Sequence, residues 1–280
     1  MRDALLVAVI ALAAGPLAAV EIQLSSDPPL PVANLAQNPG MEEGQDDQPA
    51  HWRWGTATPD NFVTEWADTG QTGARSLYLK AHSGKMSGYW SQAVEVEPGR
   101  EHVFKGFYRL GGGRILCRVH GKAQQGAEVA QVDERVYFGS MRGHWLVPVF
   151  IPEEALAGAD PEEWYPFRVA AKIPEELRSV SLSVGMYFTP GEVSFDDVWF
   201  GLARTTLKVK IEAGEDQLKE IRIWSDQREE PLFASPEGAS LPATFEKVLE
   251  DVPADAVYRV GVTTADGQRT ARDYPEQGGD

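Results

Sequence analysis

An all-β protein with two sandwich domains is the architecture that this sequence predicts. Glycine occurs 27 times and proline 19 times in 280 residues, which suits many short strands joined by turns better than long helices. Runs of alternating apolar and polar residues recur between turn signals through residues 37–202 and again through residues 204–276. A period of two is typical of antiparallel strands that bury one face. A hydrophobic fraction of 42% supplies the side chains for a sizeable core.

The first 19 residues predict a secretory signal peptide. Arg2 supplies a positive charge, residues 4–14 are apolar, and residues 17–19 (LAA) offer a cleavage site. The apolar run is shorter than the roughly 20 residues that span a bilayer, although an uncleaved anchor is the alternative. Residues 20–36 are rich in proline, serine and alanine and form either a linker or a first edge strand. We expect a secreted, periplasmic or cell-surface protein without a transmembrane anchor after cleavage, and the lone cysteine fits bacterial export.

The first domain, residues 37–202, contains several segments with strand periodicity. The longest is residues 179–188, in which Val180, Leu182, Val184 and Met186 fall on one side. We expect such segments to form an antiparallel sandwich with one buried face for each sheet. Residues 152–164 interrupt the alternation of apolar and polar residues and predict an acidic loop with about one helical turn.

The single cysteine, Cys117, alternates in register with Ile115 and Val119. We therefore expect a buried core thiol rather than a nucleophile, and no intramolecular disulfide.

A second domain is expected to begin near Ala203 and Arg204 and to extend to residue 276. Leu207, Val209 and Ile211 alternate as the inward side of its first strand, and residues 265–268 (ADGQ) predict a hairpin turn. This pattern indicates a small immunoglobulin-like or transthyretin-like sandwich. We expect it to act as a spacer or to dock a protein partner.

Three segments of the first domain resemble a known family. They are residues 38–44 (NPGMEEG), 90–99 (WSQAVEVEPG) and 191–200 (GEVSFDDVWF). In this order they resemble the galactose-binding-like jelly roll of carbohydrate-binding modules in families 4, 9, 16 and 22. The resemblance extends over residues 34–202 and implies a jelly-roll sandwich that binds a glycan. Met41 departs from the family pattern, which has an aromatic residue there. The thioether side chain of methionine and an aromatic ring are both suited to a core position.

The resemblance also implies a structural calcium ion between the first and last strands of the jelly roll. Carried over to this sequence, the ligands are Glu42 or Glu43 together with Asp196 or Asp197. Calcium takes six to eight oxygen ligands, and paired carboxylates neutralise its charge. Adjacent residues of a regular strand point to opposite faces, so we expect only one aspartate, Asp197, to be a ligand. Turn capping or solvation is the alternative for these acids.

A glycan site in such a jelly roll lies either on the concave face of one sheet or in loops at one edge. Pyranose rings stack on aromatic side chains there and receive hydrogen bonds from polar ones. Alternation predicts that Tyr108 and Tyr187 face away from the inward Phe107 and Met186, and Trp90 could instead be core packing. The candidate ligand-binding residues are Trp54, Trp66, Tyr89, Trp90, Tyr108, Trp145, Tyr187 and Arg109, with Gln92 and Arg118 as further polar partners.

Charge and motifs exclude several functional classes. A net charge of -16 argues against a nucleic-acid partner, because phosphate binding requires clustered cations. The sequence has no His-Glu-x-x-His, Gly-x-Ser-x-Gly or phosphate-loop motif, and its five histidines are scattered. We therefore expect an exported, non-catalytic protein whose jelly roll binds a glycan by aromatic stacking. The alternative is a cell-surface or periplasmic structural protein that uses the jelly roll to bind protein.

Overall fold

The computed structural model describes residues 20–122, 144–153, 158–214 and 217–275. The chain divides into two compact units. One comprises Val32–Arg204, and the other combines the residues up to Pro31 with those from Thr205 onward. The expected signal peptide and the end of the C-terminal tail lie outside the described residues.

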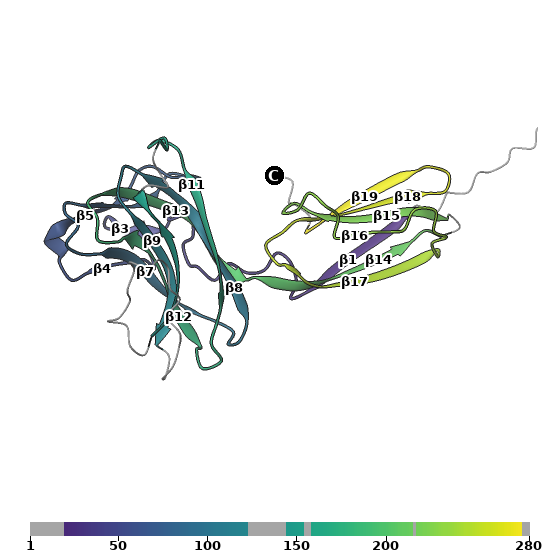
Figure 1. The fold of residues 1–280 in the computed structure, drawn as a ribbon, viewed down its shortest axis with the longest axis horizontal. Coiled ribbons are helices and arrows are strands. Elements are labelled where there is room, and N and C mark those ends of the chain that lie inside the picture. The colour runs from purple at the N-terminus through teal and green to yellow at the C-terminus, as the bar shows by residue number, and fades with distance from the viewer. Residues whose placement is uncertain (1–19, 123–143, 154–157, 215–216, 276–280) are drawn as a thin grey trace, which may run out of the picture. The chain divides into compact units, whose positions relative to one another are not determined.

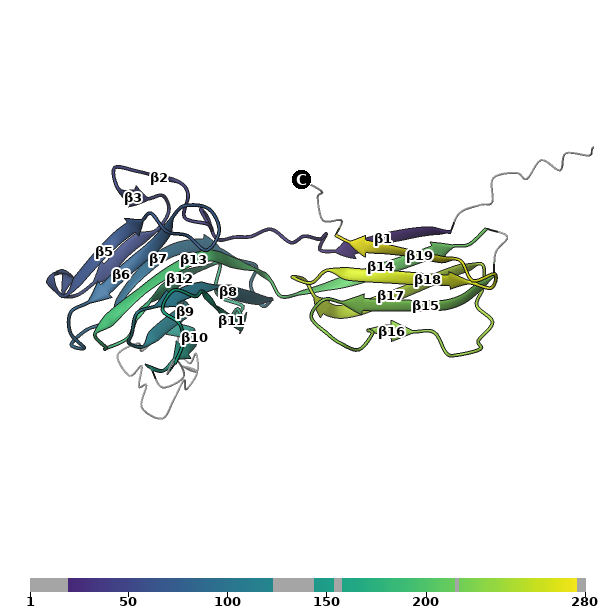
Figure 2. The same cartoon turned by 90° about the horizontal axis from the view of Figure 1, so that it is seen from above.

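The unit Val32–Arg204 is a jelly-roll sandwich of two five-stranded sheets (Figures 1 and 2). The strand orders are β10-β9-β12-β7-β4, here the β12 sheet, and β11-β8-β13-β6-β5, here the β13 sheet. All pairings are antiparallel and the chain passes repeatedly from one sheet to the other, which defines a jelly roll. Its elements are β2 (Gly44–Gln45), β3 (Gln48–Pro49), β4 (Arg53–Thr56), the short helix η1 (Pro59–Asn61), β5 (Phe62–Ala67), β6 (Ser76–Ala81), β7 (Gly88–Glu95), β8 (Glu101–Leu110), β9 (Ile115–Lys122), β10 (His144–Ile151), β11 (Tyr165–Lys172), β12 (Ser179–Met186) and β13 (Gly191–Leu202).

The core of this unit lies between the two sheets. The inward side of β12 is the predicted one, and Val180, Leu182, Val184 and Met186 are each at most 2% exposed. Cys117 is fully buried in the same cluster, as predicted, and burial raises the pKa of its thiol. Met41, at the position where the family has an aromatic residue, is also fully buried in this core.

The second unit is a smaller sandwich of a three-stranded sheet, β1-β14-β17, and a four-stranded sheet, β16-β15-β18-β19. Leu207, Val209 and Ile211 face inward as predicted, and the predicted turn at residues 265–268 joins β18 to β19. The strands are β1 (Glu21–Asp27), β14 (Arg204–Glu212), β15 (Leu218–Ser225), β16 (Phe233–Ala234), β17 (Thr244–Pro253), β18 (Tyr258–Thr264) and β19 (Arg269–Tyr274).

Strand β1 shows that residues 20–36 are more than a linker or an edge of the jelly roll. It pairs along its whole length with β14, placing Ile22 opposite Ile211. Arg272 of β19 also donates a hydrogen bond to the Ile22 carbonyl oxygen. The second unit is therefore built from both ends of the chain, because a strand before the jelly roll completes a sheet whose other strands follow it.

The rest of this segment belongs to the jelly roll. Asn34 donates to the carbonyl oxygen of Val198 and accepts from the backbone of Phe200, so it is tied to β13. The acidic loop predicted at residues 152–164 is described only in part, since residues 154–157 lie outside the described ranges. Its described end forms a turn in which the Glu163 backbone donates to Asp160. Within the described ranges, no helix is long and apolar enough to cross a membrane.

Lowering the pH should destabilise the jelly-roll unit through His102. This side chain is fully buried and its ring stacks on Phe200 with centroids 5.1 Å apart. Burial lowers the pKa of His102 below its ordinary value of about 6.5. At a pH below about 6.5 the unfolded chain therefore binds a proton at this residue that the folded unit does not bind. The contribution of His102 to the free energy of unfolding should fall as pH decreases below about 7, by up to ~1.4 kcal/mol per pH unit. Asp196, whose pKa is raised to about 7 by burial, binds a proton in the folded unit over the same range and contributes in the opposite direction. Urea unfolding at several pH values measures the slope.

The variant His102→Phe keeps a ring against Phe200 and should remove the contribution of His102 from that slope. His82→Gln, at an exposed histidine of the same unit, is the control and should leave the slope unchanged. An unaltered slope in His102→Phe would show that other groups carry the pH dependence.

The assignment of β1 to the second unit predicts where a mutation at Ile22 acts. Ile22 is 4% exposed, so Ile22→Ala should lower the free energy of unfolding of this unit by about 2–4 kcal/mol. Gln23→Ala changes an exposed neighbour on the same strand and should have little effect. Calorimetry that resolves two transitions provides the measurement, and a shift of the jelly-roll transition instead would contradict the assignment.

Candidate functional site

The outer face of the β12 sheet carries a group of polar and aromatic side chains. Val180, Leu182, Val184 and Met186 of β12 are buried in the core, so the residues between them, Ser181, Ser183 and Gly185, lie on the opposite face. All three are small, and Ser183 and Gly185 are themselves buried. The register sets Ser183 beside Arg118 of β9 on one side and beside Ser91 of β7 on the other. The small residues of the middle strand are thus flanked by polar residues, of which Arg118 is the largest.

Arg118 lies at the centre of this face. Its guanidinium carbon lies 4.1 Å from the centroid of the Tyr89 ring, a cation–π contact. Burial lowers the pKa of Arg118, with Tyr89 and Tyr187 opposing that shift. Its Nε is buried and has no hydrogen-bond partner among the described residues. Buried donors are rarely left without a partner, so this nitrogen indicates a position for water or a ligand.

A glycine permits the contact between Tyr89 and Arg118. A Cβ on Gly185 would lie 2.1 Å from the carbonyl oxygen of Gly88 and 2.6 Å from Cδ1 of Tyr89. Any larger residue would therefore displace the tyrosine ring from its place across β12.

Hydroxyl groups and a histidine extend the polar group. Ser91 Oγ donates to Ser183 Oγ at 2.9 Å, and Nε2 of His120 lies 3.2 Å from the same oxygen. Tyr187, just beyond the end of β12, packs edge-on against Phe150 with ring centroids 6.0 Å apart. We call this set the Arg118 face, made up of Tyr89, Ser91, Arg118, His120, Ser183 and Tyr187.

Three of the predicted ligand-binding aromatics are core residues instead. Trp90, Tyr108 and Trp145 are 2%, 5% and 7% exposed and belong to the core cluster, so no sugar ring can stack on them. The orientation predicted for Tyr108 was wrong. Along β8 the buried positions include Phe104 and Tyr108, and Phe107 is the residue that faces outward.

The other predicted residues are dispersed over the unit. Trp54 packs between Phe62 and Trp90, with ring centroids 5.1 and 5.7 Å away. Trp66 donates through Nε1 to the Met41 carbonyl oxygen at 2.5 Å, and the guanidinium of Arg75 lies over its ring.

Arg109 is on the β13 sheet, where its guanidinium lies over Trp164. Gln92 is buried and exchanges two hydrogen bonds with the backbone of Gln37. Of the candidates, Tyr89, Tyr187 and Arg118 share one face. Ser91, His120 and Ser183 were not singled out from the sequence, although the alternation of β12 already placed its serines outward.

The predicted calcium ligands lie around the loop that precedes β6. Glu42 Oε1 accepts hydrogen bonds from the backbone of Ala74 and Arg75, each at 2.9 Å. Asp196 Oδ2 accepts from the backbone of Gln71 at 2.6 Å and of Thr72 at 3.3 Å. Between the two glutamates, Glu42 is the one held by this loop, and Glu43 is exposed.

Both aspartates reach the same loop, contrary to the expectation that they point to opposite faces. Thr72 Oγ1 donates to Asp197 Oδ1 at 2.7 Å, close to the contacts of Asp196. The reason is an irregularity of β13 between Asp196 and Trp199, where Asp197 has a φ of 49°. A bulge of this kind breaks the strict alternation of side chains.

The loop surrounds a buried carboxyl group. Asp196 is fully buried, and burial raises its pKa to about 7 against the opposing effect of three backbone hydrogen bonds. Among the described residues, no basic side chain forms an ion pair with it. Equally, no three His, Cys, Asp or Glu side chains of the described ranges come together as a metal-binding group. Any cation here would therefore depend on backbone carbonyl oxygens in addition to Glu42 and the aspartates.

Comparison with known proteins identifies structural neighbours only. No protein-family model matches the sequence, and no curated protein matches it. A family 61 carbohydrate-binding module in complex with β-1,4-galactotriose is 15% identical, with a TM-score of 0.39, over 61% of this chain and 99% of the module. A family 22 xylan-binding domain from Paenibacillus barcinonensis is 12% identical, with a TM-score of 0.37, over 66% of this chain and 96% of the domain.

A tailspike protein of bacteriophage CBA120 is 16% identical, with a TM-score of 0.39. The match covers 60% of this chain but only 21% of the tailspike domain. Modules of families 4 and 16 are similar to this chain as well. The solved structures that this chain resembles thus include carbohydrate-binding modules of four families, while the strand order and register of the chain itself define its jelly-roll fold.

Proposed function

We propose that this chain is an exported, non-catalytic protein whose jelly-roll unit binds a glycan on the Arg118 face. The observation that carries the proposal is the buried Nε of Arg118, a donor without a partner among the described residues on the outside of a sheet. A sugar hydroxyl is both donor and acceptor and could satisfy it. The hydroxyl oxygen of Ser91, which is only half-buried, offers a further hydrogen bond, whereas the hydroxyl of Ser183 is fully buried.

The aromatic residues of this face would supply the apolar part of the interaction. Pyranose rings present C–H groups that pack on aromatic rings, and Tyr187 is only half-buried. One side of the Tyr89 ring is occupied by Arg118, so its role would be to orient the guanidinium. The structural neighbours include modules named for galactotriose and xylan, and these glycans are the natural first probes.

Replacement of Arg118 provides the decisive test. Arg118→Gln should weaken binding of the recognised polysaccharide about tenfold or more in affinity gel electrophoresis, because a charge-assisted donor contributes roughly 1.5–3 kcal/mol. Arg168→Gln, at an exposed arginine of β11 in the other sheet, is the matched control and should bind normally.

A panel of galactan, xylan and mixed β-glucans serves for the first screen. If the folded protein binds none of these polymers, the jelly roll would be better explained as a structural or protein-binding unit. If Arg118→Gln binds as the unaltered protein does, the site lies elsewhere.

We further propose that the loop of residues 70–75 holds a structural calcium ion. Asp196 is a buried carboxylate without a basic partner in the described chain, and Glu42 and Asp197 converge on the same loop. These residues fit a hard, oxygen-seeking cation, provided that backbone carbonyl oxygens complete its coordination. The ion would tie the first segment of the jelly roll to its last strand and stabilise the fold.

Removal of calcium should therefore destabilise the jelly-roll unit. We expect excess chelator to lower its melting temperature by several degrees, since a ligand that binds only the native state stabilises it by mass action. Asp197→Asn should remove most of the difference between melts with calcium and with chelator. Asp160→Asn changes an exposed acid in the same unit and should leave the difference between the two melting temperatures unchanged. Identical melts of the unaltered protein under both conditions would dismiss the calcium site.

A further inference from the structure

The outer face of the four-stranded sheet in the second unit contains a hollow of about 410 Å³. Its floor includes Gly261 and Ala271, and Trp224 lies beside them. The register explains the shape: Arg222 of β15, Gly261 of β18 and Ala271 of β19 are aligned across the sheet. Two small residues in one row leave the middle of the face low. We call this the Trp224 hollow.

The ring of Trp224 extends over this floor. A Cβ on Gly261 would lie 3.0 Å from Cζ3 and 3.4 Å from Cη2 of the indole, closer than comfortable packing allows. Glycine at this position thus lets the indole lie along the sheet. Trp224 is only half-buried, so part of it faces solvent.

Trp224 differs from the other incompletely buried tryptophans of the chain. Three of these have a cation over the ring. Arg75 lies over Trp66. Arg109 lies over Trp164, and Lys105 lies over Trp199. Trp54 is packed against two other rings. Within the described residues, Trp224 has neither a cation nor another ring against it. Its aromatic surface is therefore available to a partner outside the chain.

Cationic side chains surround the hollow although the chain as a whole has a net charge of -16. Arg259 is fixed by two hydrogen bonds to Asp273, at 2.8 and 3.1 Å, and Arg222 by an ion pair with Glu220. Arg269 is exposed and has no ion pair with any described residue. Glu220 and Asp273 neutralise two of the three lining arginines, and Arg269 leaves one positive charge at the hollow.

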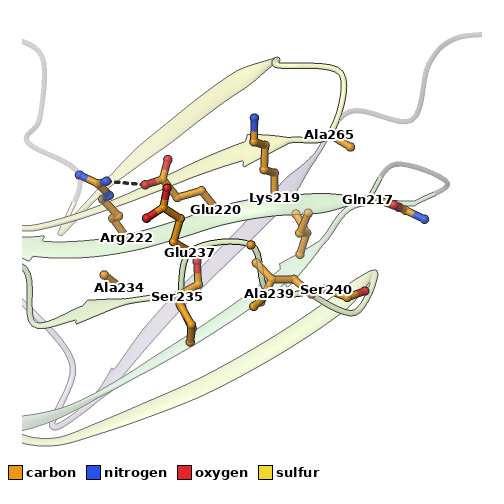
Figure 3. Close-up of a pocket in the computed structure, with 14 residues that line it drawn as sticks. Gln217, Lys219, Glu220, Arg222, Ala234, Ser235, Glu237, Ala239, Ser240 and Ala265 are labelled. Carbon is orange, nitrogen blue, oxygen red and sulfur yellow. Dashed lines mark ion pairs between the residues drawn. The ribbon is translucent and has the colours of Figure 1, made fainter.

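A second pocket of about 600 Å³ adjoins the hollow and shares Glu220 and Arg222 with it (Figure 3). It is lined by the start of β15 and by the segment from Ala234 to Leu241. Figure 3 shows the Arg222–Glu220 ion pair at one end of this pocket and Lys219 above it. Together the two hollows provide room for more than one sugar unit of a chain.

We propose that the Trp224 hollow binds an acidic polysaccharide. A pyranose ring stacks on the indole, which is flat and unoccupied, and its carboxylate pairs with Arg269. Arg222 and Arg259, each held by a carboxylate, can donate hydrogen bonds to sugar hydroxyls from fixed positions. This site is on the second unit and does not depend on the Arg118 face.

Affinity gel electrophoresis with polygalacturonate is the test, with dextran as the neutral polymer and poly-L-glutamate as an acidic polymer without sugar rings. Polygalacturonate should retard the full chain, whereas dextran should not. Trp224→Ala and Arg269→Gln should each weaken this retardation about tenfold, a loss typical of one good stacking or charge-assisted contact. Arg228→Gln, at an exposed arginine of the same unit outside the hollow, is the matched control and should behave as the unaltered protein does.

Each alternative result has a distinct meaning. If poly-L-glutamate retards the chain as strongly as polygalacturonate does, the hollow recognises an acidic protein rather than a sugar, and the proposal is overturned. Loss of binding in Arg118→Gln alone would place acidic-glycan binding on the jelly roll and overturn the proposal. Absence of retardation would also overturn it. Arg269→Gln alters an exposed side chain and should fold, so it keeps the test valid if Trp224→Ala is unstable.

Discussion

Burial of alternate residues between the two sheets of the jelly roll determines where every outer side chain lies. On β12, the inward Val180, Leu182, Val184 and Met186 leave small residues outward, and the antiparallel register then places Arg118 and Ser91 beside them. A shift of one residue would reverse both faces at once. The polar group on the outer face is thus a consequence of the same constraint that builds the core.

The last strand of the jelly roll shows what happens where that constraint is interrupted. The bulge after Asp196 allows two consecutive aspartates to contact one loop, and the first of them is fully buried. Burying a carboxylate costs free energy unless hydrogen bonds or a cation offset it. Three backbone N–H groups offset part of the cost here. The geometry therefore concentrates negative charge where the first segment of the unit meets its last strand.

Three of the five half-buried tryptophans in the described residues are covered by the chain's own cations. Arg75, Lys105, Arg109 and Arg118 each lie over a ring, which reduces the number of aromatic surfaces open to other molecules. Counting aromatic residues in the sequence therefore overestimates the possible platforms. Trp224 is an exception that the sequence did not single out, since its strand looked like an ordinary part of a spacer domain.

The sequence by itself determined the all-β class, the buried side of β12 and β14, and the burial of Cys117, because a period of two depends only on local strand geometry. The jelly-roll type came from the family resemblance. The same resemblance placed Glu42 or Glu43 with Asp196 or Asp197 as candidates for one site, with Asp197 as the expected ligand. Tertiary structure alone decided that β1 completes the second unit, that Asp197 turns with Asp196, and that Trp90, Tyr108 and Trp145 are core. Those outcomes depend on pairing between residues far apart in the chain and on a bulge, and local patterns carry no information about either.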